Sequence, residues 1–120
     1  MNASVQPLHL RAAEPFPYSG PDELKGPIEA ALRRVSDPEV AMSIVDVGLV
    51  YGVEVDHRQV HVLVTATSAA CPVIDVIVDD IWHELSRVVP QSLALDVELV
   101  WEPPWLPARM SERARLIMGW

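Results

Sequence analysis

The sequence has little cysteine, little basic charge and no long hydrophobic run, and each shortage argues against a class of protein. Cys71 is the single cysteine among 120 residues, so one chain can form neither an internal disulfide nor a four-cysteine metal site. The nine Lys and Arg residues never form a run and the net charge is −8, which disfavours binding to nucleic acid. No apolar segment approaches the length of a membrane span, and no basic region followed by an apolar run opens the chain. We therefore expect a cytoplasmic protein that binds neither nucleic acid nor membrane.

Several catalytic signatures are missing as well. The sequence contains no glycine-rich phosphate-binding motif, no His-Glu-x-x-His and no Gly-x-Ser-x-Gly. Its four histidines lack the spacing of a zinc site and suit solvated surface positions. We therefore predict no bound nucleotide and no tightly bound metal.

The composition predicts one folded domain preceded by an arm. Half of the residues are apolar, which suits a chain with one modest core. Residues 1–20 carry three prolines and no regular period, which predicts an extended or mobile arm that is dispensable for folding. The alternative is an arm whose Phe16 and Tyr18 pack on the body or on a second subunit. The domain itself is expected to span residues 21–120.

Hydrophobic periodicity predicts helices over residues 21–35 and 72–89 and strands over residues 49–55, 60–66 and 93–101. Residues 40–47 are interpreted as an irregular loop, and the three prolines of residues 102–107 as a stiff extended loop. Ser111 suits the N-cap of a last short helix, and Gly119 suits its end. The order helix, strand, strand, helix, strand, helix predicts an α+β fold, a two-layer sandwich whose small mixed sheet has its helices packed on one face.

The helix predicted for residues 72–89 is apolar around more of its girth than packing against one sheet requires. Such a helix is expected to meet a second helix or a second subunit as well. We therefore expect a homodimer.

The stretch from Thr65 to Pro72, Thr-Ala-Thr-Ser-Ala-Ala-Cys-Pro, links a predicted strand to this helix. Pro72 suits the first helical position, which places Cys71 at the N-cap beside the positive end of the helix dipole. A thiol there has its thiolate stabilised, and the thiolate binds metal or attacks an electrophile. The alternative is a buried, inert cysteine, and both interpretations stay open. Thr65 and Thr67, two apart on a strand, direct their hydroxyls to the same side and make a polar site near Cys71 more plausible.

Four further residues are candidates for lining that site. For Asp37, Glu39 and Asp46 the favoured role is structural, capping turns and accepting from nearby N–H groups. A site role is the next interpretation for Asp46. The indole of Trp105 either covers the edge of the core or walls a pocket over Cys71.

Four sequence blocks in order resemble the PaaD/SufT-like family of accessory proteins in iron–sulfur cluster assembly. They are Asp37-Pro38-Glu39, the segment Ile44 to Tyr51, the segment Thr65 to Pro72, and Pro103-Pro104-Trp105. The resemblance implies the α+β fold, an oligomer that is often a dimer, and delivery of clusters to client apoproteins with the help of assembly proteins. Cys71 matches the functional cysteine of the family, and Asp37, Glu39, Asp46, Thr65, Thr67 and Trp105 fall within the matching blocks.

PaaD-type members that serve phenylacetyl-CoA oxygenase typically carry an additional cysteine-rich C-terminal segment, which is not found up to Trp120. We therefore expect a general factor of the SufT kind. One thiolate cannot complete the ligands of a cluster, so Cys71 is expected to hold an iron–sulfur cluster only transiently. Two alternatives are a thiol-dependent enzyme with Cys71 as nucleophile and a protein-binding adaptor without cluster chemistry.

Overall fold

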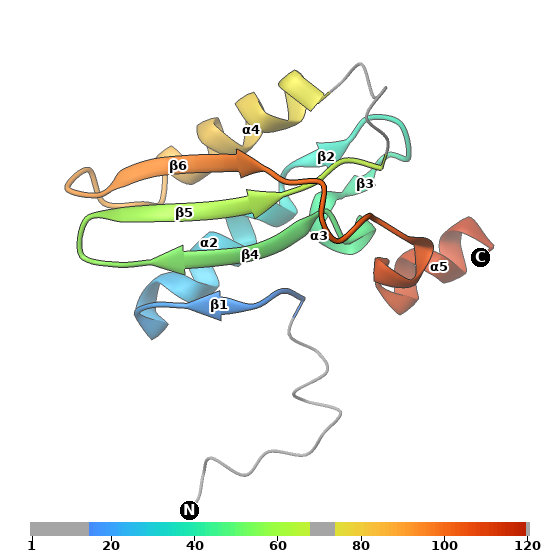
Figure 1. Cartoon of the computed structure of the whole chain (residues 1–120), viewed down its shortest axis with the longest axis horizontal. Coiled ribbons are helices and arrows are strands. Elements are labelled where there is room, and N and C mark those ends of the chain that lie inside the picture. Colours follow the sequence, from blue (N-terminus) through green and yellow to red (C-terminus); the bar gives the residue numbers. More distant parts are fainter. Residues whose placement is uncertain (1–14, 68–73, 120) are drawn as a thin grey trace, which may run out of the picture.

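The structure, a computed structural model, describes residues 15–67 and 74–119 (Figure 1). Its elements in chain order are β1 (Tyr18–Ser19), α2 (Asp22–Arg33), β2 (Ser36–Asp37), β3 (Met42–Ser43), α3 (Ile44–Val47), β4 (Val50–Val55), β5 (Gln59–Val64), α4 (Ile74–Ser86), β6 (Ala94–Leu99), the 3-10 helix η1 (Pro107–Arg109) and α5 (Glu112–Met118). The long helices and strands keep the predicted order. Their observed bounds differ from the predicted ones by only a few residues.

The main sheet is mixed, with strand order β1-β4-β5-β6. β4 and β5 form an antiparallel hairpin, whereas β1 runs parallel to β4 and β6 runs parallel to β5. Asp56 fixes the hairpin turn, because its Oδ1 accepts from the N–H groups of Arg58 at 2.7 Å and Gln59 at 2.9 Å. These two hydrogen bonds stabilise the carboxylate and hold the pKa of Asp56 below its usual value.

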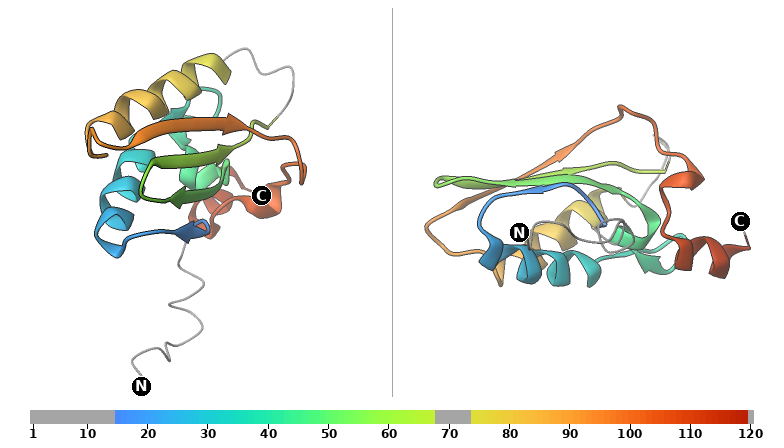
Figure 2. Two further views of the ribbon diagram at one scale, coloured as in Figure 1. Left: turned by 60° about the vertical axis from the view of Figure 1, so that its left-hand side comes forward. Right: turned by 90° about the horizontal axis from the view of Figure 1, so that it is seen from below.

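Helices α2 and α4 lie on one face of this sheet, and the other face is open in the part of the chain that the structure describes (Figure 2). Alternate residues of a strand point to opposite faces of the sheet. The side chains of β5 that point toward α2 and α4 are fully buried; they are Val60, Val62 and Val64. Leu32 of α2 and Ile81 of α4 are also fully buried in this core. The two-layer α+β sandwich with helices on one face is confirmed. The expectation that the apolar helix meets a second helix is met by α2 and α4, which contact each other.

The N-terminal boundary of the folded body differs from the prediction. Phe16 is only 6% exposed and belongs to the main core, and Tyr18 pairs with Val53 of β4. Residues 15–20 therefore form part of the fold, as in the alternative that had Phe16 and Tyr18 pack on the body. The period-based argument missed them because a two-residue strand shows no alternation. The remainder of the expected arm, residues 1–14, lies outside the described residues.

The expectation of an irregular loop over residues 40–47 was also wrong. Met42–Ser43 pair with Ser36–Asp37 to form the small hairpin β2–β3, and Ile44–Val47 form the short helix α3. Ser43 caps α3 by accepting from the N–H of Val45 at 3.1 Å, and Gly48 ends the helix with φ of 83°. Elements this short are stabilised by such caps and by burial, and not by a repeating pattern.

Candidate functional site

Helix α3 lies at one end of the molecule, where most of the described candidate residues gather. Figure 1 shows β2, β3, α3, the end of β5 and α5 at this end. The N–H of Ile44 donates to the carbonyl of Val35, and the N–H of Thr65 donates to the carbonyl of Leu49 at 2.8 Å. The first bond ties α3 to the chain just after α2, and the second ties the residue after the C-cap of α3 to the chain just after β5. Helix α3 and its C-terminal cap therefore connect segments that are distant in the sequence.

Asp37 has the structural role that sequence analysis favoured. Its side chain is buried, and Oδ1 accepts from the N–H of Glu39 at 2.9 Å, while its carbonyl accepts from Val40 and Ala41. This pattern closes the β2–β3 turn, in which Ala41 adopts a positive φ of 57°. Glu39 lies exposed on the turn itself. Both carboxyl groups therefore lie in the hairpin beside α3.

Asp46 fastens α3 to the C-terminal helix. Its Oδ1 accepts from Ser111 Oγ at 3.1 Å and lies 3.5 Å from Arg33 Nη1, and its carbonyl accepts from the N–H of Ser111 at 2.8 Å. Ser111 in turn caps α5 by accepting from Ala114 N at 3.0 Å, which confirms its predicted N-cap role. A hollow of about 510 Å³ lies between the β2–β3 hairpin and α5, and Asp46 lines it.

Trp105 covers the edge of the core. Its ring is half-buried against core residues, and Nε1 donates to the carbonyl of Val47 at 2.8 Å. Two further contacts hold the same loop: Tyr51 Oη donates to the carbonyl of Pro103 at 2.7 Å, and the guanidinium of Arg109 lies 4.3 Å from the centroid of the Tyr51 ring. The loop is thus fixed against α3 and β4.

Thr65 carries a buried hydroxyl group at the end of β5. The residue is 3% exposed, and Oγ1 has no hydrogen-bond partner within the described ranges. A hollow of about 10 Å³ lies beside it, lined otherwise by apolar side chains of β6, α4 and Ala66. That volume suits about one water molecule. A buried hydroxyl without a partner is costly and therefore rare, so this one calls for an explanation. Thr67 is half-buried and ends the described segment.

Cys71 lies outside the described residues, four positions after Thr67 and three before Ile74. Its predicted N-cap position and thiolate character are therefore expectations still. Among residues 15–67 and 74–119, no group of three His, Asp or Glu side chains could hold a metal ion. The described part of the site thus offers hydroxyl groups, carboxylates and an indole, and no metal cage.

Comparison with known sequences decides the family. The sequence pattern of the family described as "Iron-sulfur cluster assembly protein" matches residues 25–97, more than half of the chain. The chain belongs to this family. The matched range contains the segment with Cys71 and the carboxylates of Asp37 and Asp46, whereas Trp105 lies beyond it.

Two similar curated proteins of this family are named for maturation of iron–sulfur proteins. The chain is 38% identical over 99 residues to the "Fe-S protein maturation auxiliary factor YitW" of Bacillus subtilis, covering 82% of this chain and 96% of that protein. It is 38% identical over 86 residues to the "Fe-S protein maturation auxiliary factor SufT" of Staphylococcus aureus, covering 71% of this chain and 97% of that protein.

Two solved structures show the same fold. A domain of unknown function from Bacillus anthracis is 37% identical with a TM-score of 0.75, covering 82% of this chain and 93% of that one. A conserved hypothetical protein from Thermotoga maritima is 34% identical with a TM-score of 0.69, covering 80% and 94%. The architecture described above is therefore shared with both of these solved structures.

Sequence analysis missed several residues that build this end of the family fold. Tyr51, Arg109 and Ser111 were not assigned to it, although each holds the loop or α5 against the body. No local pattern could have identified them, because their contacts join positions more than fifty residues apart. Only the cap chemistry of Ser111 was visible in the sequence.

Proposed function

We propose that the chain is an auxiliary factor in iron–sulfur protein maturation that helps to deliver clusters to client apoproteins, with Cys71 as a transient cluster ligand. The observation that carries the proposal is the match over 96% of the length of a relative named as an auxiliary factor in Fe-S protein maturation. The partners would be assembly proteins and clients. The cytoplasm is the expected compartment. None of the helices within residues 15–67 and 74–119 has the length and hydropathy of a membrane span.

The chemistry of the chain suits transfer better than storage. A cluster normally takes four cysteine ligands or their equivalents, and this chain offers one thiolate. The other ligands would come from a client, a second copy of the chain or a small thiol. Replacement of these ligands by the cysteines of the client would move the cluster, as cargo, to the client. The residues that would line or support that site are Asp37, Glu39, Asp46, Thr65, Thr67 and Trp105. The buried hydroxyl of Thr65, which has no hydrogen-bond partner within residues 15–67 and 74–119 and is near Cys71 in the sequence, supports this placement.

The test compares Cys71→Ser and Cys71→Ala with the unchanged chain. Each protein is reconstituted anaerobically with iron and sulfide, and transfer to an apo-ferredoxin is followed by absorption and by recovery of electron-transfer activity. We expect Cys71→Ser to fold because a serine hydroxyl is a good N-cap, and Cys71→Ala to fold because the thiol that it removes is only a weak hydrogen-bond acceptor. Both should lose transfer. Full transfer by the alanine variant would show that Cys71 is not the cluster ligand, and absence of transfer by the unchanged chain would instead support an adaptor without cluster chemistry.

The thiol itself is tested by alkylation with iodoacetamide across a pH series. A helix N-terminus favours the anion, so the apparent pKa of Cys71 is expected below the ordinary value of about 8.5. Asp75 and the net charge of −8 work against this effect. An apparent pKa at or above the ordinary value would remove the thiolate argument. Covalent labelling by a carbonyl substrate analogue, with no cluster transfer, would favour the thiol-dependent enzyme.

The homodimer belongs to the same proposal. The residues Leu116 and Ile117 on α5 are 76% and 63% exposed, the largest fractions among the large hydrophobic residues of the described chain. A second copy covering both would remove apolar surface from water. Light scattering at micromolar concentration should give a dimer mass for the unchanged chain and a monomer mass for Leu116→Lys. A monomer mass for both would contradict the dimer.

A further inference from the structure

Strand β6 presents an open edge of the main sheet. It pairs with β5 on one side, and on its other side no strand of the described chain pairs with it. Ala94 N donates to Arg58 O and Val100 N donates to Val64 O, both at 2.8 Å, so the even-numbered residues face β5. Because strand residues alternate in direction, the N–H and C=O groups of Leu95, Val97 and Leu99 face outward. Three successive outward pairs are a template for an added strand.

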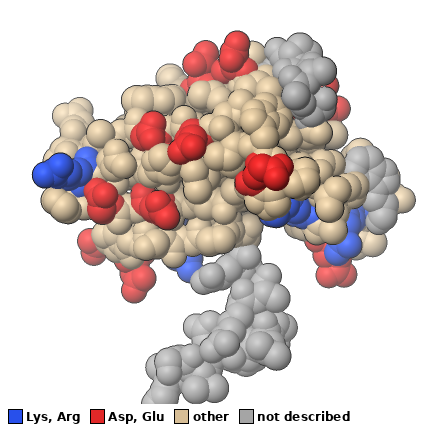
Figure 3. Space-filling view, viewed as in Figure 1, with Lys and Arg blue, Asp and Glu red and all other residues tan. Residues whose placement is uncertain are grey.

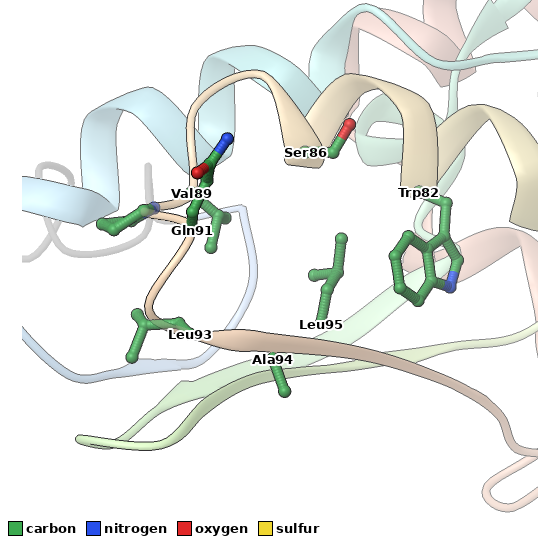
Figure 4. Close-up of a pocket in the computed structure, with 8 residues that line it drawn as sticks. Trp82, Ser86, Val89, Gln91, Leu93, Ala94 and Leu95 are labelled. Atoms are coloured by element: carbon green, nitrogen blue, oxygen red, sulfur yellow. The ribbon is translucent and has the colours of Figure 1, made fainter.

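A groove runs beside the β6 edge, between this strand and α4. Its volume is about 420 Å³, and its lining is mostly apolar: Trp82, Ser86, Val89, Pro90, Gln91, Leu93, Ala94 and Leu95. In Figure 4 the indole of Trp82 reaches from α4 toward the level of Leu95 on β6. Trp82 is 46% exposed although it is a large aromatic residue. Side chains of an added strand that point to the helical layer would meet this indole.

The open face beside the same edge is acidic. The side chains of Asp96 and Glu98 are 54% and 53% exposed, and Glu54 on β4 is the cross-strand neighbour of His61 on β5. His61 is the one basic residue among them, with Nδ1 at 2.7 Å from Asp96 and Nε2 at 2.9 Å from Glu98. Figure 3 shows acidic side chains spread over this face. One histidine therefore faces three carboxylates.

We propose that the β6 edge binds an extended segment of a partner protein in which apolar and basic residues alternate. The outward N–H and C=O groups of β6 would pair with the backbone of that segment. Its apolar side chains would enter the groove at Trp82, and its basic side chains would lie over Asp96 and Glu98. As the docking site of a client this inference rests on the proposed function, but the binding itself needs no Cys71.

The charges favour a basic segment over a second copy of this chain. Antiparallel pairing of two β6 strands that uses all three outward residues would be centred on Val97. It would place Asp96 of one copy opposite Glu98 of the other, twice. Like charges directly opposite each other destabilise a strand pair, whereas a lysine in that place is attracted. The edge thus disfavours its own copy and suits a cationic segment.

The probe is an acetylated and amidated heptapeptide, Val-Lys-Val-Lys-Val-Lys-Val, labelled with a fluorophore and followed by anisotropy. The matched control peptide carries Glu in place of each Lys. Two attractive cross-strand pairs, at Asp96 and Glu98, become repulsive with the control peptide, which predicts that the lysine peptide binds tighter by about tenfold or more. Equal binding of the two peptides, or no binding of either, would overturn the proposal.

Protein variants locate the binding. Val97→Pro removes one outward N–H at an edge position where proline is tolerated, and it should weaken binding of the lysine peptide about tenfold. The double variant Asp96→Asn/Glu98→Gln should weaken binding of the lysine peptide about fivefold. The matched control variant Glu23→Gln/Glu112→Gln removes the same charge elsewhere and should weaken this binding less than about twofold. Circular dichroism checks that each variant folds. Unchanged affinity in both edge variants would refute the assignment.

Two measurements distinguish binding at the β6 edge from the proposed cluster transfer and from dimer formation through the same edge. Cys71→Ser should bind the lysine peptide as the unchanged chain does, so loss of cluster transfer with intact peptide binding would leave the docking edge standing. Sedimentation of the unchanged chain and of Val97→Pro tests for a second copy at the edge. The proposal would be overturned if the unchanged chain forms a dimer that Val97→Pro dissociates but that the lysine peptide leaves intact.

Discussion

Replacing Gly48 by alanine would strain the turn that holds the C-terminal loop against α3. Gly48 has φ of 83°, and a Cβ there would overlap the carbonyl oxygen of Arg109 and lie 2.6 Å from its carbonyl carbon. Both close atoms are backbone, so no flexible side chain can move aside. Either α3 or the segment of residues 107–110 must shift.

The cost of Gly48→Ala follows from two terms. The left-handed conformation costs an alanine about 1–2 kcal/mol. A shift of the loop endangers two hydrogen bonds, from Trp105 to Val47 and from Ser111 to Asp46, each worth about 0.5–1.5 kcal/mol. Together they predict a loss of about 2–5 kcal/mol in the free energy of unfolding.

Two other glycines provide matched controls. Gly26 lies inside α2, and apart from its chain neighbours and the helix backbone a Cβ at this position would have no atom within 4 Å. The gain in helix propensity, about 0.5–1 kcal/mol, is opposed by the contact of the new Cβ with the ring of Pro27, so Gly26→Ala should change the stability by less than about 1 kcal/mol. Gly119 has φ of 76° but equally open space, so Gly119→Ala should show the backbone strain alone, about 1–2 kcal/mol at most. The difference between Gly48 and Gly119 measures the collision with Arg109.

The assay is urea unfolding followed by circular dichroism. With a slope of about 1–3 kcal/mol per molar urea, Gly48→Ala should lower the midpoint by about 0.7–5 M, and Gly26→Ala should shift it by less than about 1 M. If Gly48→Ala costs no more than Gly119→Ala, the close packing of Arg109 on Gly48 is not part of the folded state, and the reasoning fails.

Three further predictions use the same unfolding assay. Trp105→Phe removes the donor to the carbonyl of Val47 and should cost about 1 kcal/mol; no change would show that this hydrogen bond is absent in solution. Phe16→Ala should cost about 3–5 kcal/mol because the ring is core; a loss under about 1 kcal/mol would return this residue to a mobile arm. The hydrogen bond from Arg34 lowers the pKa of Glu84 in the folded protein below its ordinary value of 4.5. The ionised Glu84 therefore stabilises the fold above pH 4.5, and this stabilisation is lost as the pH falls through the lower pKa of the folded state. The stability gap between the unchanged chain and Glu84→Gln should therefore shrink from about pH 6 to about pH 3, and a constant gap would contradict it.

Local chemistry was enough to predict the long elements and several of their ends. Alternation identified β5 and β6 because their inward side chains repeat every second residue. Ser111 and Gly119 marked the limits of α5, since a capping hydroxyl and a left-handed C-cap depend on the residue itself. The motif blocks around Asp37 and Cys71 identified the family before any geometry was known.

Tertiary contacts decided what surrounds those blocks. Residues 40–47 show no hydrophobic period that predicts α3. This helix forms because Ser43 and Gly48 cap it and because its three apolar side chains are buried. Tyr51 meets the carbonyl of Pro103 across 52 positions, and Asp46 meets Ser111 across 65. A sequence pattern records neighbours along a helix or a strand, whereas pairs so far apart are brought together only when the sheet and its two helices pack.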